Sequence, residues 1–124
     1  MSQWGLILGY APRANITFKM SDSVPSWHGI TVRTDSMGMR QNGEKSSADM
    51  VQVILIAGDS FTFGARVEGK DTWGACIEGK TGMGVLNAGV WGYGTAQSLL
   101  RIELRIDRYG LKPDLISLSR MALT

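Results

Sequence analysis

Hydrophobic and polar positions divide the chain into two parts of different character. Residues 1–48 contain two short stretches with β-type alternation, 15–20 and 29–34, which can pair as an antiparallel ribbon. In the remaining residues, 49–124, longer apolar runs alternate with segments of helical spacing. The pattern predicts a single domain, in which an N-terminal ribbon and connector precede an α/β core.

Three apolar runs in the second part have the length of strands. They cover residues 51–57, 85–88 and 115–118. The first is rich in β-branched residues and does not alternate, which is typical of a parallel strand buried on both faces. We therefore expect about three parallel strands.

Two segments between these runs carry helix signals. The first helix is expected to begin after an Asp71-Thr72 cap and to end in the glycines at 79–82. The second is expected to begin at a Thr95 cap and to continue to about Tyr109, where Gly110 stops it. Strands alternating with helices in this order predict βαβ units and a parallel sheet.

The segment 100–107 also alternates with period two, so its periodicity alone permits a strand. Alternating charge signs and the cap signals at both ends favour a helix. On that helix Ile102 and Ile106 form one apolar stripe, and Leu100 and Leu104 form another. Two stripes need two covering surfaces, one of which could belong to another chain.

Composition excludes several classes of function. The 124 residues carry a formal net charge of +2, with no basic run longer than a pair, so neither nucleic acid nor an anionic membrane is indicated as a partner. The longest apolar stretches fall far short of the roughly 18 residues of a membrane span, and the N-terminus lacks the features of a secretory signal. We therefore expect a cytoplasmic protein. With a single cysteine, Cys76, and a single histidine, His28, no disulfide, metal site or cofactor is expected.

The candidate chemistry lies at Gly58-Asp59-Ser60, which follows the first parallel strand, where open α/β sheets place their binding crevice. Taken alone, this tripeptide is an ordinary turn. Its context, Ala-Gly-Asp-Ser-Phe-Thr-Phe-Gly at 57–64 and Asn-Ala-Gly-Val-Trp-Gly-Tyr-Gly at 87–94, resembles the first two sequence blocks of the SGNH (GDSL-type) hydrolases. The upstream segment 34–40 is similar to the Asn-Ser-Leu-Gly-Phe-Arg segment that precedes the nucleophile block in many members.

The resemblance implies a flavodoxin-like α/β/α fold and the chemistry of serine esterases and lipases. Ser60 matches the nucleophile, and its backbone N–H together with that of Gly92 matches two donors of the oxyanion hole. Asn87, which opens the second block, matches a structural asparagine, and Gly58 and Asp59 support the nucleophile turn.

Two later blocks of the family are absent from this sequence. The third, Gly-x-Asn-Asp, has no match after the strand at 115–118, and the fourth, Asp-x-x-His, which supplies the general base, has none at all. Asp59 is too acidic to deprotonate an alcohol efficiently, and His28 stands in a loop that matches no family base. The expectation is a sheet truncated to the N-terminal part of the fold.

Two functions follow from this expectation, and the glycine-rich turn at 89–94 raises a third. The first is a catalytically incomplete domain that serves as an oligomeric scaffold or small-ligand binder. The alternative is a serine ester hydrolase that uses Ser60 with a base supplied across an oligomer interface. A nucleotide-binding loop at the glycine-rich turn 89–94 is poorly supported, because its spacing is not Gly-x-Gly-x-x-Gly. We expect a homodimer or higher oligomer, formed through the 115–118 strand edge or the 95–109 helix.

Overall fold

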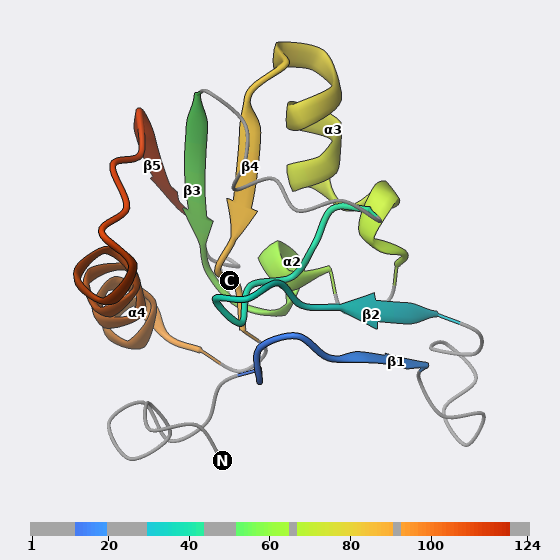
Figure 1. Ribbon diagram of the computed structural model, residues 1–124, viewed down its shortest axis with the longest axis horizontal. Helices are drawn as coiled ribbons and strands as arrows, with labels where there is room; N and C mark the ends of the chain where they lie inside the picture. The colour runs from blue at the N-terminus through green and yellow to red at the C-terminus, as the bar shows by residue number, and fades with distance from the viewer. Residues whose placement is uncertain (1–11, 20–29, 44–51, 65–66, 91–92, 120–124) are drawn as a thin grey trace, which may run out of the picture.

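The computed structural model describes five segments of the chain: residues 12–19, 30–43, 52–64, 67–90 and 93–119. Their centre is a three-stranded parallel sheet with helices packed against it (Figure 1). The molecule is therefore an α/β protein, as the strand and helix pattern predicts.

The sheet consists of β3 (Val53–Ala57), β4 (Gly84–Asn87) and β5 (Leu115–Leu118), in the order β4-β3-β5. The run with the most β-branched residues is the central strand, which is hydrogen-bonded on both sides. Leu55 of β3 lies opposite Leu86 of β4 and Ile116 of β5. All three strands are parallel and their carboxyl ends lie at the same edge, so the loops that follow β3 and β4 are neighbours.

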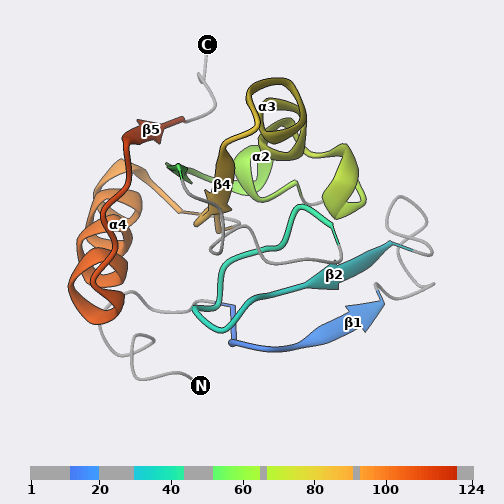
Figure 2. The same cartoon turned by 45° about the horizontal axis from the view of Figure 1, so that its top comes forward.

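The sheet is covered by α3 (Trp73–Thr81) on one face and by α4 (Thr95–Tyr109) on the other (Figures 1 and 2). Alternate residues of β3 point to opposite faces, and the core is divided accordingly. The α3 side contains Ile54, Ile56, Val85, Trp73, Ile77 and Met83. The α4 side contains Leu55, Ala57, Leu86, Ala88, Ile102, Met37 and Met39.

The ends of α3 and α4 lie where the sequence predicts them, except at the N-cap of α4. The Thr72 hydroxyl accepts a hydrogen bond from the Ala75 N–H at 3.2 Å, and α3 ends at Gly82. The expected Thr95 cap is wrong, because Thr95 is already the first helical residue and Gly94 is the N-cap. Extended backbone at Gly94 allows its own N–H to donate to the Gln97 side chain at 3.0 Å, so the glycine can begin the helix without a cap side chain.

The N-terminal ribbon forms as predicted, although it is shorter. β1 (Thr17–Lys19) pairs antiparallel with β2 (Thr31–Arg33), and the ribbon lies beyond the carboxyl ends of β3 and β4 (Figures 1 and 2). Arg40 pairs with both Thr34 and Asn87 in isolated antiparallel bridges. The polypeptide after the ribbon therefore joins it to the central sheet.

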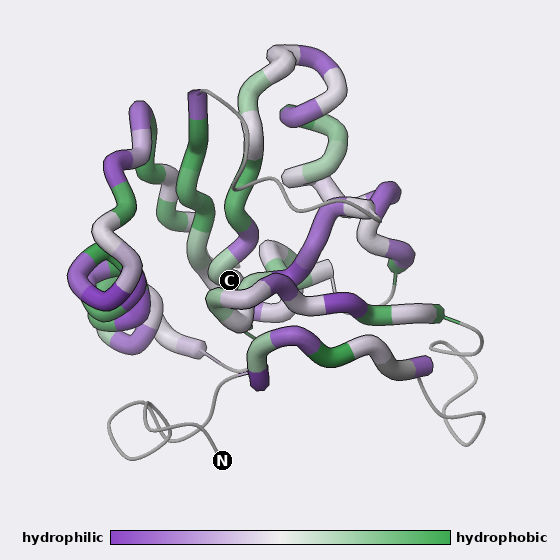
Figure 3. Tube along the Cα trace, viewed as in Figure 1, coloured by the Kyte–Doolittle hydropathy of each residue, from purple (hydrophilic) through white to green (hydrophobic). Residues whose placement is uncertain are grey.

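β5 exposes apolar side chains on both faces of the sheet. Leu115 is 57%, Ile116 46% and Leu118 39% exposed, and Figure 3 shows this hydrophobic strand at the outer side of the sheet. By contrast, the second apolar stripe of α4, Leu100 and Leu104, packs against a buried pair in the same chain, Val90 and Tyr93. The large apolar side chains that are exposed in the described part of the chain thus include three neighbours on β5; the others, Phe61, Val67, Leu99 and Tyr109, lie elsewhere.

Among the described residues, every helix is too short or too polar to cross a membrane.

Candidate functional site

The nucleophile candidate stands at the start of a short helix that follows β3 directly. This helix, α2 (Ser60–Phe63), is one turn long, which is too short for hydrophobic periodicity to predict it. Asp59 is its N-cap, and the Asp59 carboxylate accepts a hydrogen bond from the Phe61 N–H at 3.0 Å. Ser60 is therefore the first helical residue at the carboxyl end of the central strand, and it is partly exposed.

Gly58 permits the chain to turn from β3 into α2. A Cβ atom at this position would lie 2.2 Å from the Ser119 carbonyl oxygen and 2.3 Å from the Thr62 Oγ1 atom. Because real Cβ atoms do not approach other atoms so closely, any side chain at Gly58 would push the end of β5 and α2 apart. Gly58 thus has a steric role in the turn that carries Ser60.

Asn87 attaches the second sequence block to α2. Its side chain is fully buried at the end of β4, and its Nδ2 atom donates to the Thr62 carbonyl oxygen at 2.7 Å. Its Oδ1 atom accepts from the Gly89 N–H at 3.0 Å. One amide group therefore satisfies a carbonyl of α2 and an N–H of the loop after β4, so Asn87 joins these two segments.

The loop after β4 packs directly on the backbone of α2. A Cβ atom on Gly89 would lie 2.5 Å from the Phe63 nitrogen and 2.9 Å from the Thr62 carbonyl carbon. The next residue, Val90, donates its N–H to the Gly58 carbonyl oxygen at 3.0 Å. The structure thus brings together the two blocks that the sequence singles out. Gly92 lies outside the described residues, so its oxyanion role stays a prediction.

Arg40 also holds the carboxyl end of α2. Its NH1 atom donates to the Phe63 carbonyl oxygen at 2.9 Å and also to the Gly64 carbonyl, and its NH2 atom donates to the Val67 carbonyl oxygen at 2.6 Å. The guanidinium carbon lies 5.1 Å from the centre of the Phe63 ring. Burial lowers the pKa of Arg40, and the nearby Glu68 carboxylate partly opposes this shift.

The backbone of Arg40 binds the second block as well, because its N–H donates to the Asn87 carbonyl oxygen at 3.0 Å. Sequence reasoning did not single this residue out. The available signal was its place as the last residue of the 34–40 segment that precedes the nucleophile block.

A second buried arginine supports the loop after β4 from the α4 side. Arg101 is fully buried, and it donates to the Ala88 carbonyl oxygen at 2.9 Å and to the Gly38 carbonyl oxygen at 3.1 Å. Burial, with the neighbouring Arg105 charge adding to it, lowers the pKa of Arg101 to about 9.

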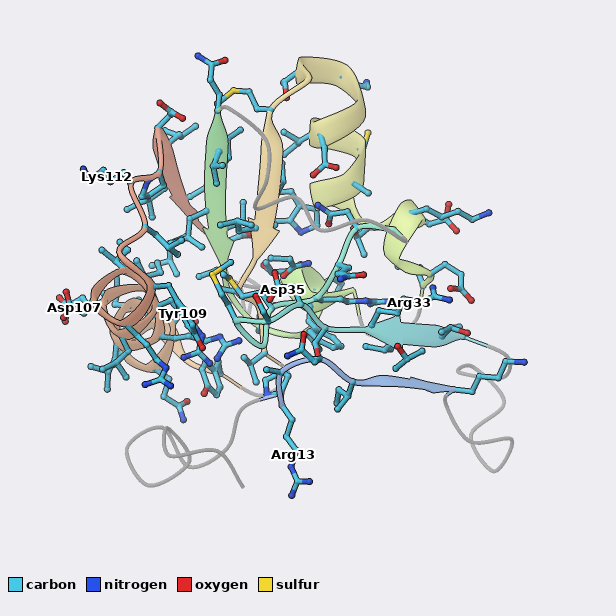
Figure 4. The ribbon with its side chains drawn as sticks, in the orientation of Figure 1. Arg13, Arg33, Asp35, Asp107, Tyr109 and Lys112 are labelled. Carbon is cyan, nitrogen blue, oxygen red and sulfur yellow. The ribbon has the colours of Figure 1, made fainter. Side chains whose placement is uncertain are left out.

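Asp35 lies between the ribbon and the sheet (Figure 4), and its carboxylate interacts electrostatically with both Arg101 and Arg105. One of its oxygens accepts from the Met37 and Met39 N–H groups at 2.9 and 3.0 Å. Burial raises the pKa of Asp35, although these hydrogen bonds and the two arginines act in the opposite direction.

In the described part of the chain, no hydrogen bond identifies a general base for Ser60. His28, the single histidine, lies outside them, and within the described ranges the Ser60 hydroxyl has no hydrogen-bond partner. That part of the chain also contains no group of three or more His, Cys, Asp or Glu side chains that could hold a metal ion. Cys76 is an exposed free cysteine.

Comparison of the chain with protein-family models and with curated proteins found no match. The resemblance to the SGNH hydrolases therefore rests on the two sequence blocks themselves.

Proposed function

We propose that Ser60 is the nucleophile of a serine ester hydrolase site of the SGNH type, of which the described residues form the nucleophile half. The observation that carries this proposal is the direct packing of the two sequence blocks, in which Asn87 and Gly89 contact the backbone of α2. A serine that begins a helix at the carboxyl end of a central parallel strand is well placed to face a substrate above the sheet.

In the proposed reaction the Ser60 oxygen attacks the acyl carbonyl carbon of an ester, and a base takes the hydroxyl proton. The negative charge that develops on the carbonyl oxygen would be held by the N–H groups of Ser60 and Gly92, as the resemblance implies. Collapse of the tetrahedral intermediate releases the alcohol and leaves an acyl-serine, which water then hydrolyses.

The sequence carries no match to the family block that would supply the general base. His28 and the other undescribed positions are candidates, and so is a residue of another polypeptide chain. Asp59 is a poor candidate, because its side chain already caps α2.

The second candidate function is a catalytically incomplete domain that binds a partner or a small ligand. The sequence has no match to the Asp-x-x-His block that supplies the general base, which favours this candidate, because a serine without a base is a weak nucleophile. In this case the packing around α2 would serve the fold alone.

Labelling with a fluorophosphonate separates the two candidates. An activated serine displaces fluoride from phosphorus and gains a stable phosphonyl adduct, which intact-mass analysis detects without knowledge of the substrate. Under the first proposal we expect one adduct per chain, lost in Ser60→Ala and retained in Ser36→Ala, a control at an exposed loop serine. An unlabelled parent chain, or an adduct that survives Ser60→Ala, would refute the hydrolase proposal for this chain and leave the second candidate.

A further inference from the structure

A cleft of about 400 Å³ lies between β2 and η3 (Gly69–Asp71), away from the residues of α2. Its two walls are joined at one end, where the Thr31 N–H donates to the Glu68 carboxylate at 3.1 Å. At the base, Gly69 packs so closely on the Gln41 carbonyl oxygen that a Cβ atom would lie 2.5 Å from it. One hydrogen bond to a side chain and one close backbone contact therefore hold the two walls of the cleft together.

The charges that line the cleft are not balanced. The side chains of Arg33 and Lys70 have no hydrogen-bond or ion-pair partner in the part of the chain that the structure describes. The carboxylate that also lines the cleft, Glu68, accepts from the Thr31 N–H and interacts electrostatically with the buried Arg40. Two cations thus face the cleft, while its one carboxylate is already engaged by other groups. Figure 4 shows the labelled Arg33 at β2, below η3.

We propose that this cleft binds a small anion, in which a phosphate or carboxylate group is attached to a polar body that carries hydroxyl groups. A volume of about 400 Å³ is at the lower end of the range for small-molecule sites, which suits a molecule the size of a monosaccharide derivative. The planar guanidinium of Arg33 can bind two oxygens of such an anion at once, and Lys70 adds a second positive charge. Gln41 and Thr31 supply polar groups for the hydroxyls of the ligand.

The proposal is independent of ester hydrolysis at Ser60, because no residue of α2 lines the cleft. It can be tested by isothermal titration calorimetry on the whole chain with four probes: glucose 6-phosphate, glucuronate, inorganic phosphate and glucose. We expect at least one of the three anions to bind, neutral glucose not to bind, and the affinity to fall as sodium chloride is added. The two sugar anions distinguish a phosphate site from a carboxylate site.

Variants connect the binding to the cleft. Arg33→Gln and Lys70→Gln should each weaken binding of the preferred anion by about tenfold, as expected for loss of one charged hydrogen bond. Lys112→Gln, at an exposed lysine remote from the cleft in Figure 4, should leave the affinity unchanged. Lys70 is itself exposed, so Lys70→Gln remains a usable variant if Arg33→Gln does not fold. Absence of binding by all three anions, equal binding of glucose, or unchanged affinity in Lys70→Gln would overturn the proposal.

Discussion

Replacement of Gly89 by alanine should destabilise the protein, because the new methyl group would meet backbone rather than side chains. The built Cβ lies 2.5 Å from the Phe63 nitrogen and 2.9 Å from the Thr62 carbonyl carbon, whereas ordinary contacts begin near 3.4 Å. These atoms belong to α2, which Asn87 and Arg40 hold in place. Relief of the overlap requires the helix or the loop to move, and overpacking of this kind costs about 1–3 kcal/mol of the free energy of unfolding.

The chain offers two matched controls for the same substitution. Gly79 lies inside α3 with nothing within 4 Å of its built Cβ, so Gly79→Ala should raise the free energy of unfolding by about 0.5–1 kcal/mol through its helix preference. Gly74, in the same helix, would place its methyl 3.0 Å from the Ile56 Cδ1 atom, at the end of a flexible side chain. Gly74→Ala should therefore fall between the other two.

Urea unfolding followed by circular dichroism measures all three variants, and a thermal scan gives a second reading of about 4 °C per kcal/mol. None of the three glycines has a positive φ, so backbone conformation does not confound the comparison. A Gly89→Ala variant as stable as the parent, or stabilised like Gly79→Ala, would refute the close packing of the two sequence blocks. If Ser60 is labelled in the parent, displacement of α2 should also slow the labelling of Gly89→Ala.

Two further predictions concern Asn87 and β5. Asn87→Ala leaves the Thr62 carbonyl and the Gly89 N–H buried without partners, so we expect the free energy of unfolding in urea to fall by about 2–4 kcal/mol. The control Gln52→Ala, at an exposed position, should change it by less than about 0.5 kcal/mol. An equal effect of both variants would contradict the assigned role of Asn87. We also propose that a second copy of the chain covers the β5 edge, so light scattering at micromolar concentration should give a mass above 13.5 kDa, and Ile116→Lys should lower it. A parent chain that is monomeric at these concentrations would exclude this association.

The fold follows from the sequence where the signals are local. The β-branched run that becomes β3 and the Thr72 and Gly82 caps of α3 specify their elements almost independently of the rest of the chain. α2 has no such signal, because a helix of one turn cannot show a period, and an isolated turn is not stable by itself. Its existence depends on Asn87 and Arg40, which are distant in the sequence.

The same distinction explains which part of the candidate site is predictable. That the ends of β3 and β4 are neighbours follows from parallel topology, so the proximity of the Ser60 turn to Asn87 is expected. The buried arginines are not expected, because Arg40 and Arg101 are of a residue type that normally faces solvent. Only the three-dimensional structure shows that their targets are carbonyl groups at the end of α2 and in the loop after β4.

The restraints on α2 are independent of any base that activates Ser60. Hydrogen bonds from Asn87 and Arg40 hold the carboxyl end of the helix, Asp59 caps its amino end, and Gly89 lets the loop after β4 lie against its backbone. Fixed N–H groups stabilise a developing oxyanion only where they are already positioned before the reaction, because reorientation during the reaction costs free energy. In the proposed hydrolase, therefore, this half of the site is preorganised whether or not the base is present. A base supplied by another residue or chain would then raise the reactivity of Ser60 without a rearrangement of α2. Its presence should therefore change the labelling of Ser60, whereas the stability of Gly89→Ala and Asn87→Ala relative to the parent should stay the same.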